Sequence, residues 1–118
     1  MKDKLEKIFH RQKSLNEKLY GEDVNVILDQ RFINLNIMAL YDEVGEVMRE
    51  TAWKNPEYTP FGWKTQSELN IEGFKEELVD TLHFFINLCI SAGMGPDELF
   101  ERYERKNDKN HKRKEDGY

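Results

Sequence analysis

Two pairs of carboxylates with a helical spacing are the residues of this sequence best suited to chemistry. Glu43 and Glu46 stand three residues apart, as do Glu77 and Asp80. On an α-helix this spacing places both side chains on adjacent turns of one face, close enough to share a divalent cation. If the two helices face each other, all four carboxylates converge. Carboxylate oxygens suit hard cations, so we expect Mg2+ at this site, with Mn2+ as a substitute.

Spacing alone does not identify a metal site, because the glutamates near the C-terminus share it and a solvated helix face explains them: Glu98, Glu101 and Glu104. Glu43 and Glu46 differ because they flank apolar residues. Gly45 between them lowers helix stability while allowing something to approach closely. Glu77 and Asp80 open the most apolar segment of the chain. An ionised acid there carries a large desolvation cost, which a bound cation compensates.

A second metal interpretation rests on the segment Asp80-Thr81-Leu82-His83. Its carboxylate-x-x-His step is similar to that of di-iron helical bundles. The step occurs once in this sequence, whereas that architecture needs it twice. Without iron, His83 is interpreted as a pocket residue or as a histidine whose hydrogen bonds are satisfied in the core.

A basic segment follows near the C-terminus of an otherwise acidic chain. Between Arg105 and Lys114 there are six cations and one anion, although the whole chain has a net charge of −5. Such a run is most often a solvated terminus, and binding of nucleic acid is its usual functional alternative. A third interpretation is that Lys106, Asn110 and Arg113 bind the phosphates of a triphosphate that a metal ion alone does not neutralise.

The elements that must position these residues are predicted to be helices, because apolar residues recur at three- and four-residue steps and no strand alternation persists. The predicted fold class is all-α, a bundle of four to five helices. Asp97 is expected as the N-cap of the last, short helix. The expected ranges are Asp3 to Tyr20, Asn25 to Thr51, Ile71 to Ala92, and a short helix after Pro96.

The loop between the second and third predicted helices contains two tryptophans. Pro56 and Pro60 interrupt any helix there, and the loop is too apolar to be a bare linker. Trp53 and Trp63 are interpreted either as lids of the core or as platforms on which a base stacks.

Length and composition bound the remaining possibilities. The 118 residues fit one all-helical domain, which we place at residues 1–107, with residues 108–118 as a basic tail of the same domain. A domain this small gains from association with a second copy, and the nearly all-round apolar helix after Ile71 favours a dimer. Cys89 lies in an apolar run and is expected to be a buried thiol in a reducing compartment. No apolar stretch approaches a membrane span, so we expect a cytoplasmic protein.

Over nearly its full length the chain resembles the dimeric dUTPase family, which is related to the MazG-like all-α nucleoside triphosphate pyrophosphatases. The resemblance is carried by FHRQKSLNEKL, EVGE, FGWK, EELVDTLHFFINL and YERKNDKNHKRKEDGY. It implies a homodimer with Mg2+ as cofactor and a nucleotide as substrate. It implies three sets of site residues: Glu43, Glu46, Glu77 and Asp80 for the metal, Lys106, Asn110 and Arg113 for phosphate, and Gln12, Asn16, Trp63 and His83 for base and sugar.

The resemblance also implies the reaction, which is the conversion of dUTP and water to dUMP and pyrophosphate. Glu43 or Glu46 is expected to take the proton from the attacking water. One alternative keeps the chemistry and changes the substrate to dCTP or to a broader set of nucleoside triphosphates. Another is a non-catalytic helical module that binds nucleic acid through its basic tail.

Overall fold

The computed structural model describes residues 3–60 and 68–117, and these residues form four α-helices and no strand. The all-α prediction is therefore confirmed. Two of the four helices agree closely with the predicted ranges, and the other two differ in ways that the local chemistry explains. The bounds are α1 Lys4–Tyr20, α2 Gln30–Arg49, α3 Ile71–Ser91 and α4 Pro96–Glu115.

Helix α1 begins and ends where its flanking residues predict. The Asp3 carboxylate accepts a hydrogen bond from the Glu6 backbone N–H at 2.8 Å, which satisfies a donor that has no partner within the helix. At the other end, Gly21 takes a φ of 107°, a conformation that suits glycine and stops the helix.

Helix α2 begins five residues later than the predicted start at Asn25. The reason is local, since the Asn25 side chain accepts a hydrogen bond from the Ile27 backbone N–H at 3.1 Å and forms an Asx turn instead of a helical turn. Leu28 then takes a φ of 53°, in the left-handed region. Apolar spacing alone does not reveal that the Asn25 side chain competes with the helix for a backbone N–H.

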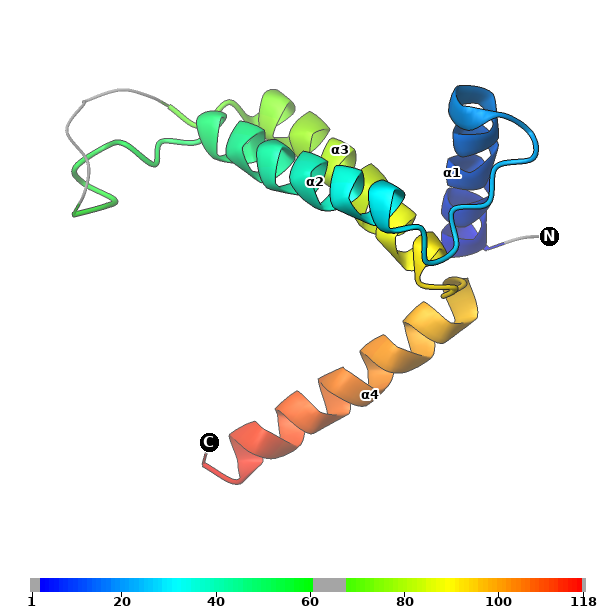
Figure 1. Cartoon of the computed structure of the whole chain (residues 1–118). Coiled ribbons are helices and arrows are strands. Elements are labelled where there is room, and N and C mark those ends of the chain that lie inside the picture. Colours follow the sequence, from blue (N-terminus) through cyan, green and yellow to red (C-terminus); the bar gives the residue numbers. More distant parts are fainter. Residues whose placement is uncertain (1–2, 61–67, 118) are drawn as a thin grey trace. The chain divides into compact units, whose positions relative to one another are not determined.

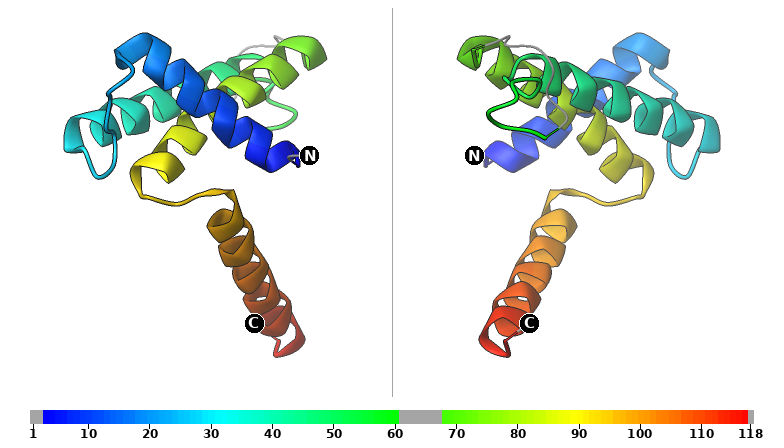
Figure 2. Two further views of the ribbon diagram at one scale, coloured as in Figure 1. Left: turned by 90° about the vertical axis from the view of Figure 1, so that its right-hand side faces the viewer. Right: turned by 90° about the vertical axis from the view of Figure 1, so that its left-hand side faces the viewer.

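Helix α4 is much longer than the predicted short helix, and it continues through most of the basic segment to Glu115 (Figure 2). The prediction of Asp97 as its N-cap is wrong, because Gly95 is the N-cap and Pro96 occupies the first position inside the helix. The division into residues 1–107 and a tail of residues 108–118 stays a prediction, although much of that tail is helical.

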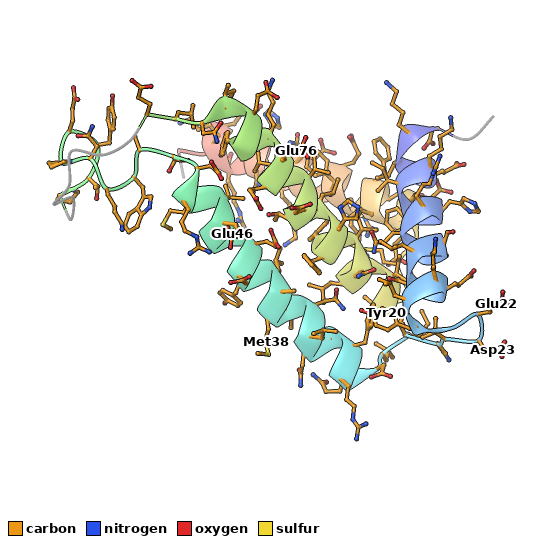
Figure 3. All side chains as sticks on the ribbon, turned by 90° about the horizontal axis from the view of Figure 1, so that it is seen from above. Tyr20, Glu22, Asp23, Met38, Glu46 and Glu76 are labelled. Carbon is orange, nitrogen blue, oxygen red and sulfur yellow. The ribbon has the colours of Figure 1, made fainter. Side chains whose placement is uncertain are left out.

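Contacts divide the chain into two units, Met1–Asp29 with Cys89–Tyr118, and Gln30–Leu88. In the second unit, α2 and α3 run antiparallel and side by side (Figures 1 and 3). A buried amide pair joins them, since Asn87 Nδ2 donates to Asn36 Oδ1 at 2.9 Å.

In the first unit, the segment before α2 is fastened to the last turn of α3. The Leu28 backbone N–H donates to the Ser91 carbonyl oxygen at 2.7 Å, and the Ser91 hydroxyl donates to the Val26 carbonyl oxygen at 2.7 Å. Ser91 is fully buried, so these bonds are shielded from water. Cys89 is buried as predicted, and burial raises the pKa of its thiol.

No single helix among the described residues has both the length and the apolar composition to cross a membrane. The bent pair of α3 and α4 meets these two criteria when the two helices are taken together.

Candidate active site

Three of the four predicted metal ligands converge between α2 and α3. One carboxylate oxygen each from Glu43, Glu77 and Asp80 lies within 4.8 Å of the other two. Glu43 and Glu77 are half-buried, whereas Asp80 is exposed. The antiparallel pairing of the helices therefore brings together side chains that are far apart in the sequence, at a separation that one divalent cation can bridge.

The environment of Glu77 opposes its negative charge. Partial burial raises the pKa of the Glu77 carboxyl most, followed by its hydrogen bond with Glu43 and by the charges of Glu43, Asp80 and Glu46. The raised pKa of Glu77 therefore marks a place in the cluster where a positive charge would be favourable.

One oxygen of the cluster lacks a partner. Glu43 Oε2 is buried and accepts no hydrogen bond from any described residue. Leaving such an acceptor unsatisfied is costly, and a hard divalent cation is a suitable partner for it. The donor set is made of carboxylates alone, which matches the preference of Mg2+ or Mn2+ for oxygen ligands. The residues present therefore fit a divalent metal ion.

Glu46 lies outside this group of three carboxylates. It forms a salt bridge with Arg49 at 2.8 Å, and this hydrogen bond together with the charge of Glu46 raises the pKa of the Arg49 guanidinium. Arg49 was not predicted as a site residue. Its spacing of three residues from Glu46 was the available signal, because side chains three residues apart on a helix are neighbours.

Gly45 is not required by any close contact within the described chain. A Cβ atom built at Gly45 would meet the guanidinium of Arg49 at 3.6 Å, which is an ordinary van der Waals distance. The close approach expected at Gly45 therefore has no partner within the part of the chain that the structure describes.

Two of the residues predicted for base and sugar binding lie together on α1. Gln12 Nε2 donates to Asn16 Oδ1 at 3.4 Å, and both side chains are buried. Asn16 also lines a pocket of about 160 Å3 together with residues of α1, the following segment and the end of α3: Lys13, Glu17, Val24, Asn25, Val26, Ile27 and Ile90. Buried amides beside a pocket are suited to reading the polar edge of a small ligand.

Of the other two residues of that predicted set, His83 lies within the described residues. His83 lies on α3, is exposed, and has its Nδ1 atom 3.0 Å from the Val79 carbonyl oxygen. This contact orients the ring when Nδ1 carries the proton. Trp63 lies outside the described residues. Trp53 is half-buried, and the ammonium of Lys54 lies 5.4 Å from the centre of its ring.

The predicted phosphate ligands share one face of α4. Lys106, Asn110 and Arg113 are separated by four and three residues, so they fall on successive turns of the same side of the helix, and all three are exposed. They belong to the first unit, whereas the carboxylates belong to the second.

Comparison with known proteins places this arrangement in context. The sequence profile of the dUTPase family matches residues 4–95. The dCTP pyrophosphatase of Enterobacteria phage LZ5 is 35% identical over 79 residues, and that of Enterobacteria phage T4 is 34% identical over 79 residues. Each alignment covers 63% of this chain and 46% of the relative, so the chain spans about half of the length of the relatives it matches. No solved structure matches the chain at a comparable level.

Proposed function

Because the chain belongs to the dUTPase family, we propose that it is a metal-dependent nucleoside triphosphate pyrophosphohydrolase that acts on dUTP. The products are dUMP and pyrophosphate. Water supplies the oxygen that binds the α-phosphorus, and the bond from the α-phosphorus to the oxygen that bridges it to the β-phosphorus breaks. The observation that carries the proposal is the convergence of the Glu43, Glu77 and Asp80 carboxylates within 4.8 Å.

In this proposal the carboxylate cluster holds Mg2+, or Mn2+ in its place, through Glu43, Glu77 and Asp80. When bound, the ion polarises phosphate oxygens and makes water more acidic. Glu46 is the residue that accepts the proton of the attacking water, because it stands on the next turn of α2 outside the three-carboxylate group. The salt bridge with Arg49 at 2.8 Å orients the Glu46 carboxylate.

The remaining site residues are proposed to hold the substrate. Lys106, Asn110 and Arg113 on α4 bind the phosphates and stabilise the departing pyrophosphate. Gln12, Asn16, Trp63 and His83 are proposed to bind the base and the sugar, and the buried Gln12–Asn16 pair beside a pocket supports this role.

A second substrate, dCTP, is favoured by the names of the two phage relatives. Uracil and cytosine differ at the edge that buried amides read, since one presents a carbonyl oxygen where the other presents an amino group. An amide side chain supplies both donors and an acceptor, so the orientation of Gln12 and Asn16 decides between the two bases.

We also propose that the protein acts as a homodimer. Large apolar side chains of α2 and α3 are exposed in the single chain: Leu35, Met38, Tyr41, Val44, Met48, Leu78, Val79, Leu82 and Phe85. Met38 points away from α3 (Figure 3). A second copy that covers this surface would remove it from water.

The test of the function is pyrophosphate release from a panel of deoxynucleoside and ribonucleoside triphosphates, with Mg2+ and with a chelator. We expect hydrolysis of dUTP that stops with the chelator, and a strong loss with Glu43→Gln or Asp80→Asn. Glu101→Gln is the matched control, because Glu101 has the same spacing on α4 outside the cluster. Equal rates on dUTP and ribonucleotides, or equal loss in the control, would contradict the proposal. A preference for dCTP would replace the substrate and keep the chemistry.

A further inference from the structure

The carboxylate cluster lies between two polar contacts that join α2 to α3. Asn36 and Glu43 are seven residues apart on α2, and Asp80 and Asn87 are seven residues apart on α3, which is about two turns on each of two antiparallel helices. The hydrogen bond between Asn36 and Asn87 therefore lies two turns from the carboxylates on one side. On the other side, Glu50 at the end of α2 is hydrogen-bonded to Asn70 just before α3.

We propose that these two contacts fix the register of α2 against α3, and we call them the first and the second register pin. Asn36, Asn87 and Asn70 are then positioning residues for the metal-binding carboxylates. The proposal rests on the proposed function in taking the cluster as the metal site. None of the three residues contacts the metal or the substrate in this proposal. They act by fixing how far α2 can slide along α3.

The first pin is an amide pair enclosed by protein. Asn87 Nδ2 donates to Asn36 Oδ1 at 2.9 Å, and Asn36 Nδ2 donates to the Phe32 carbonyl oxygen at 2.8 Å. Asn36 is 2% exposed and Asn87 is 5% exposed. A slide of one helical turn, about 5.4 Å, would break the bond between the helices and bury its polar groups without each other.

The second pin joins the end of α2 to the start of α3. The Asn70 backbone N–H donates to the Glu50 carbonyl oxygen at 2.9 Å, and Asn70 Nδ2 donates to Glu50 Oε2 at 2.9 Å. Asn70 also acts as a cap for α3, since its Oδ1 accepts from the Gly73 N–H at 3.3 Å and its carbonyl oxygen accepts from the Phe74 N–H at 2.8 Å.

The cluster needs such pins because its carboxylate oxygens lie within 4.8 Å of one another in one alignment of the two helices, and a divalent cation requires its ligands at that separation. Apolar packing tolerates alternative alignments, whereas a buried amide pair satisfies its hydrogen bonds in one alignment only. A single buried asparagine specifies register in coiled coils for the same reason.

The experiment compares Mn2+ binding and unfolding in the metal-free full chain. Asn36→Leu combined with Asn87→Leu removes both partners of the hydrogen bond between the helices, so neither amide is left without the other and the loss of stability is expected to be smaller than with either single substitution. We expect Mn2+ affinity, measured by electron paramagnetic resonance, to fall about tenfold or more, as when groups that orient metal ligands are removed. Asn34→Leu is the matched control, because it removes a side-chain hydrogen bond within α2 alone, which Gln30 Nε2 donates to Asn34 Oδ1 at 2.8 Å.

Asn70→Asp tests the second pin in a variant whose helix cap is retained. The new carboxylate still accepts from the Gly73 N–H, but it no longer donates to Glu50 and repels it instead. We expect weaker Mn2+ binding with little change in helical content. Wild-type affinity in both the Leu pair and Asn70→Asp, or an equal loss in Asn34→Leu, would overturn the proposal.

Mn2+ binding is measured without nucleotide, which keeps this proposal separate from the proposed function. A wild-type chain that hydrolyses no triphosphate, while the pin variants lose Mn2+ affinity, contradicts the function and supports the pins. A wild-type chain that hydrolyses dUTP, while the pin variants bind Mn2+ normally, supports the proposed function and contradicts the role of the pins.

Discussion

Glu77 stands where its negative charge is opposed by burial and by three neighbouring acids in the metal-free chain. Its pKa is raised above the ordinary value of 4.5, first by partial burial and then by Glu43 and Asp80. The same crowding of carboxylates makes the position favourable for a cation, whose charge would offset their repulsion. The acids of the cluster therefore differ from Glu101 and Glu104 in having other carboxylates close by, since Glu101 and Glu104 have the same spacing but are exposed on α4.

The raised pKa of Glu77 predicts a pH dependence for the metal-free protein. Between the ordinary pKa and the raised one, the folded chain binds more protons than the unfolded chain, so the free energy of unfolding falls as pH rises through this window. Urea unfolding with a chelator measures it. Glu77→Gln removes the titration and is expected to be more stable than wild type near neutral pH, with the advantage vanishing in acid.

Added Mg2+ is the control for this prediction. It is expected to stabilise the wild-type chain more than the Glu77→Gln chain, because a ligand that binds only the folded state raises its stability by an amount that grows with the logarithm of ligand concentration over Kd. A wild type and variant whose unfolding curves keep the same separation at every pH would contradict the assignment of the raised pKa to Glu77.

At the scale of the elements, two glycines in the helices of the site are expected to respond differently to alanine. A Cβ at Gly45 finds ordinary contact with Arg49 at 3.6 Å, whereas a Cβ at Gly73 would lie 2.6 Å from Glu50 Oε2 and 2.7 Å from Asn70 Nδ2. Gly45→Ala should raise the free energy of unfolding by about 0.5–1 kcal/mol through helix propensity. Gly73→Ala should lose that gain because it separates Asn70 from Glu50.

Thermal unfolding of the two alanine variants as metal-free proteins measures the difference. An equal gain in both would mean that Glu50 and Asn70 move aside without loss, which would weaken the case for the second pin.

The last turn of α3 offers a further prediction at this scale. Ser91→Ala deletes the buried bond to the Val26 carbonyl oxygen, which then keeps only the bond from the Asp29 N–H at 3.2 Å, so the free energy of unfolding should fall by about 1 kcal/mol. Ser14→Ala, at an exposed position of α1, is the control and should change the free energy of unfolding by less than about 0.5 kcal/mol. Chemical denaturation of both variants measures how much the hydrogen bond between Ser91 and the segment before α2 contributes to the free energy of unfolding.

Helix α4 shows why one element was predicted too short. Apolar spacing ends near Tyr103, and the helix beyond it has no buried residue. Its residues are mostly Lys, Arg and Glu, which have high helix propensity. Pairs such as Arg102 with Glu98, at 2.7 Å, support it from within. Periodicity of apolar residues detects packed faces, so it does not detect the part of a helix whose described residues are all exposed or half-buried.

At the scale of the whole molecule, the exposed apolar surface of α2 leads to a prediction about assembly. Met38 is 71% exposed and Tyr41 is 78% exposed in the single chain. If a second copy covers this surface, Met38→Glu should weaken the dimer about tenfold or more, because it removes apolar burial and adds a charge. Sedimentation velocity measures the change.

Leu19→Glu on α1 is the matched control, since Leu19 is also an exposed apolar residue, 63% accessible, and lies outside α2 and α3. A wild-type chain that sediments as a monomer at high concentration, or a dimer weakened equally by both substitutions, would contradict the assignment of this surface.

The sequence by itself determined the fold class, the helix boundaries set by Asp3 and Gly21, and the small set of acids from which a metal site can be built. These features depend on local propensity and on spacing along one helix, which a linear pattern records. The tertiary structure alone decided that Glu43, Glu77 and Asp80 converge while Glu46 pairs with Arg49. That outcome depends on the register between two antiparallel helices, and register is set by contacts between residues that are distant in the chain.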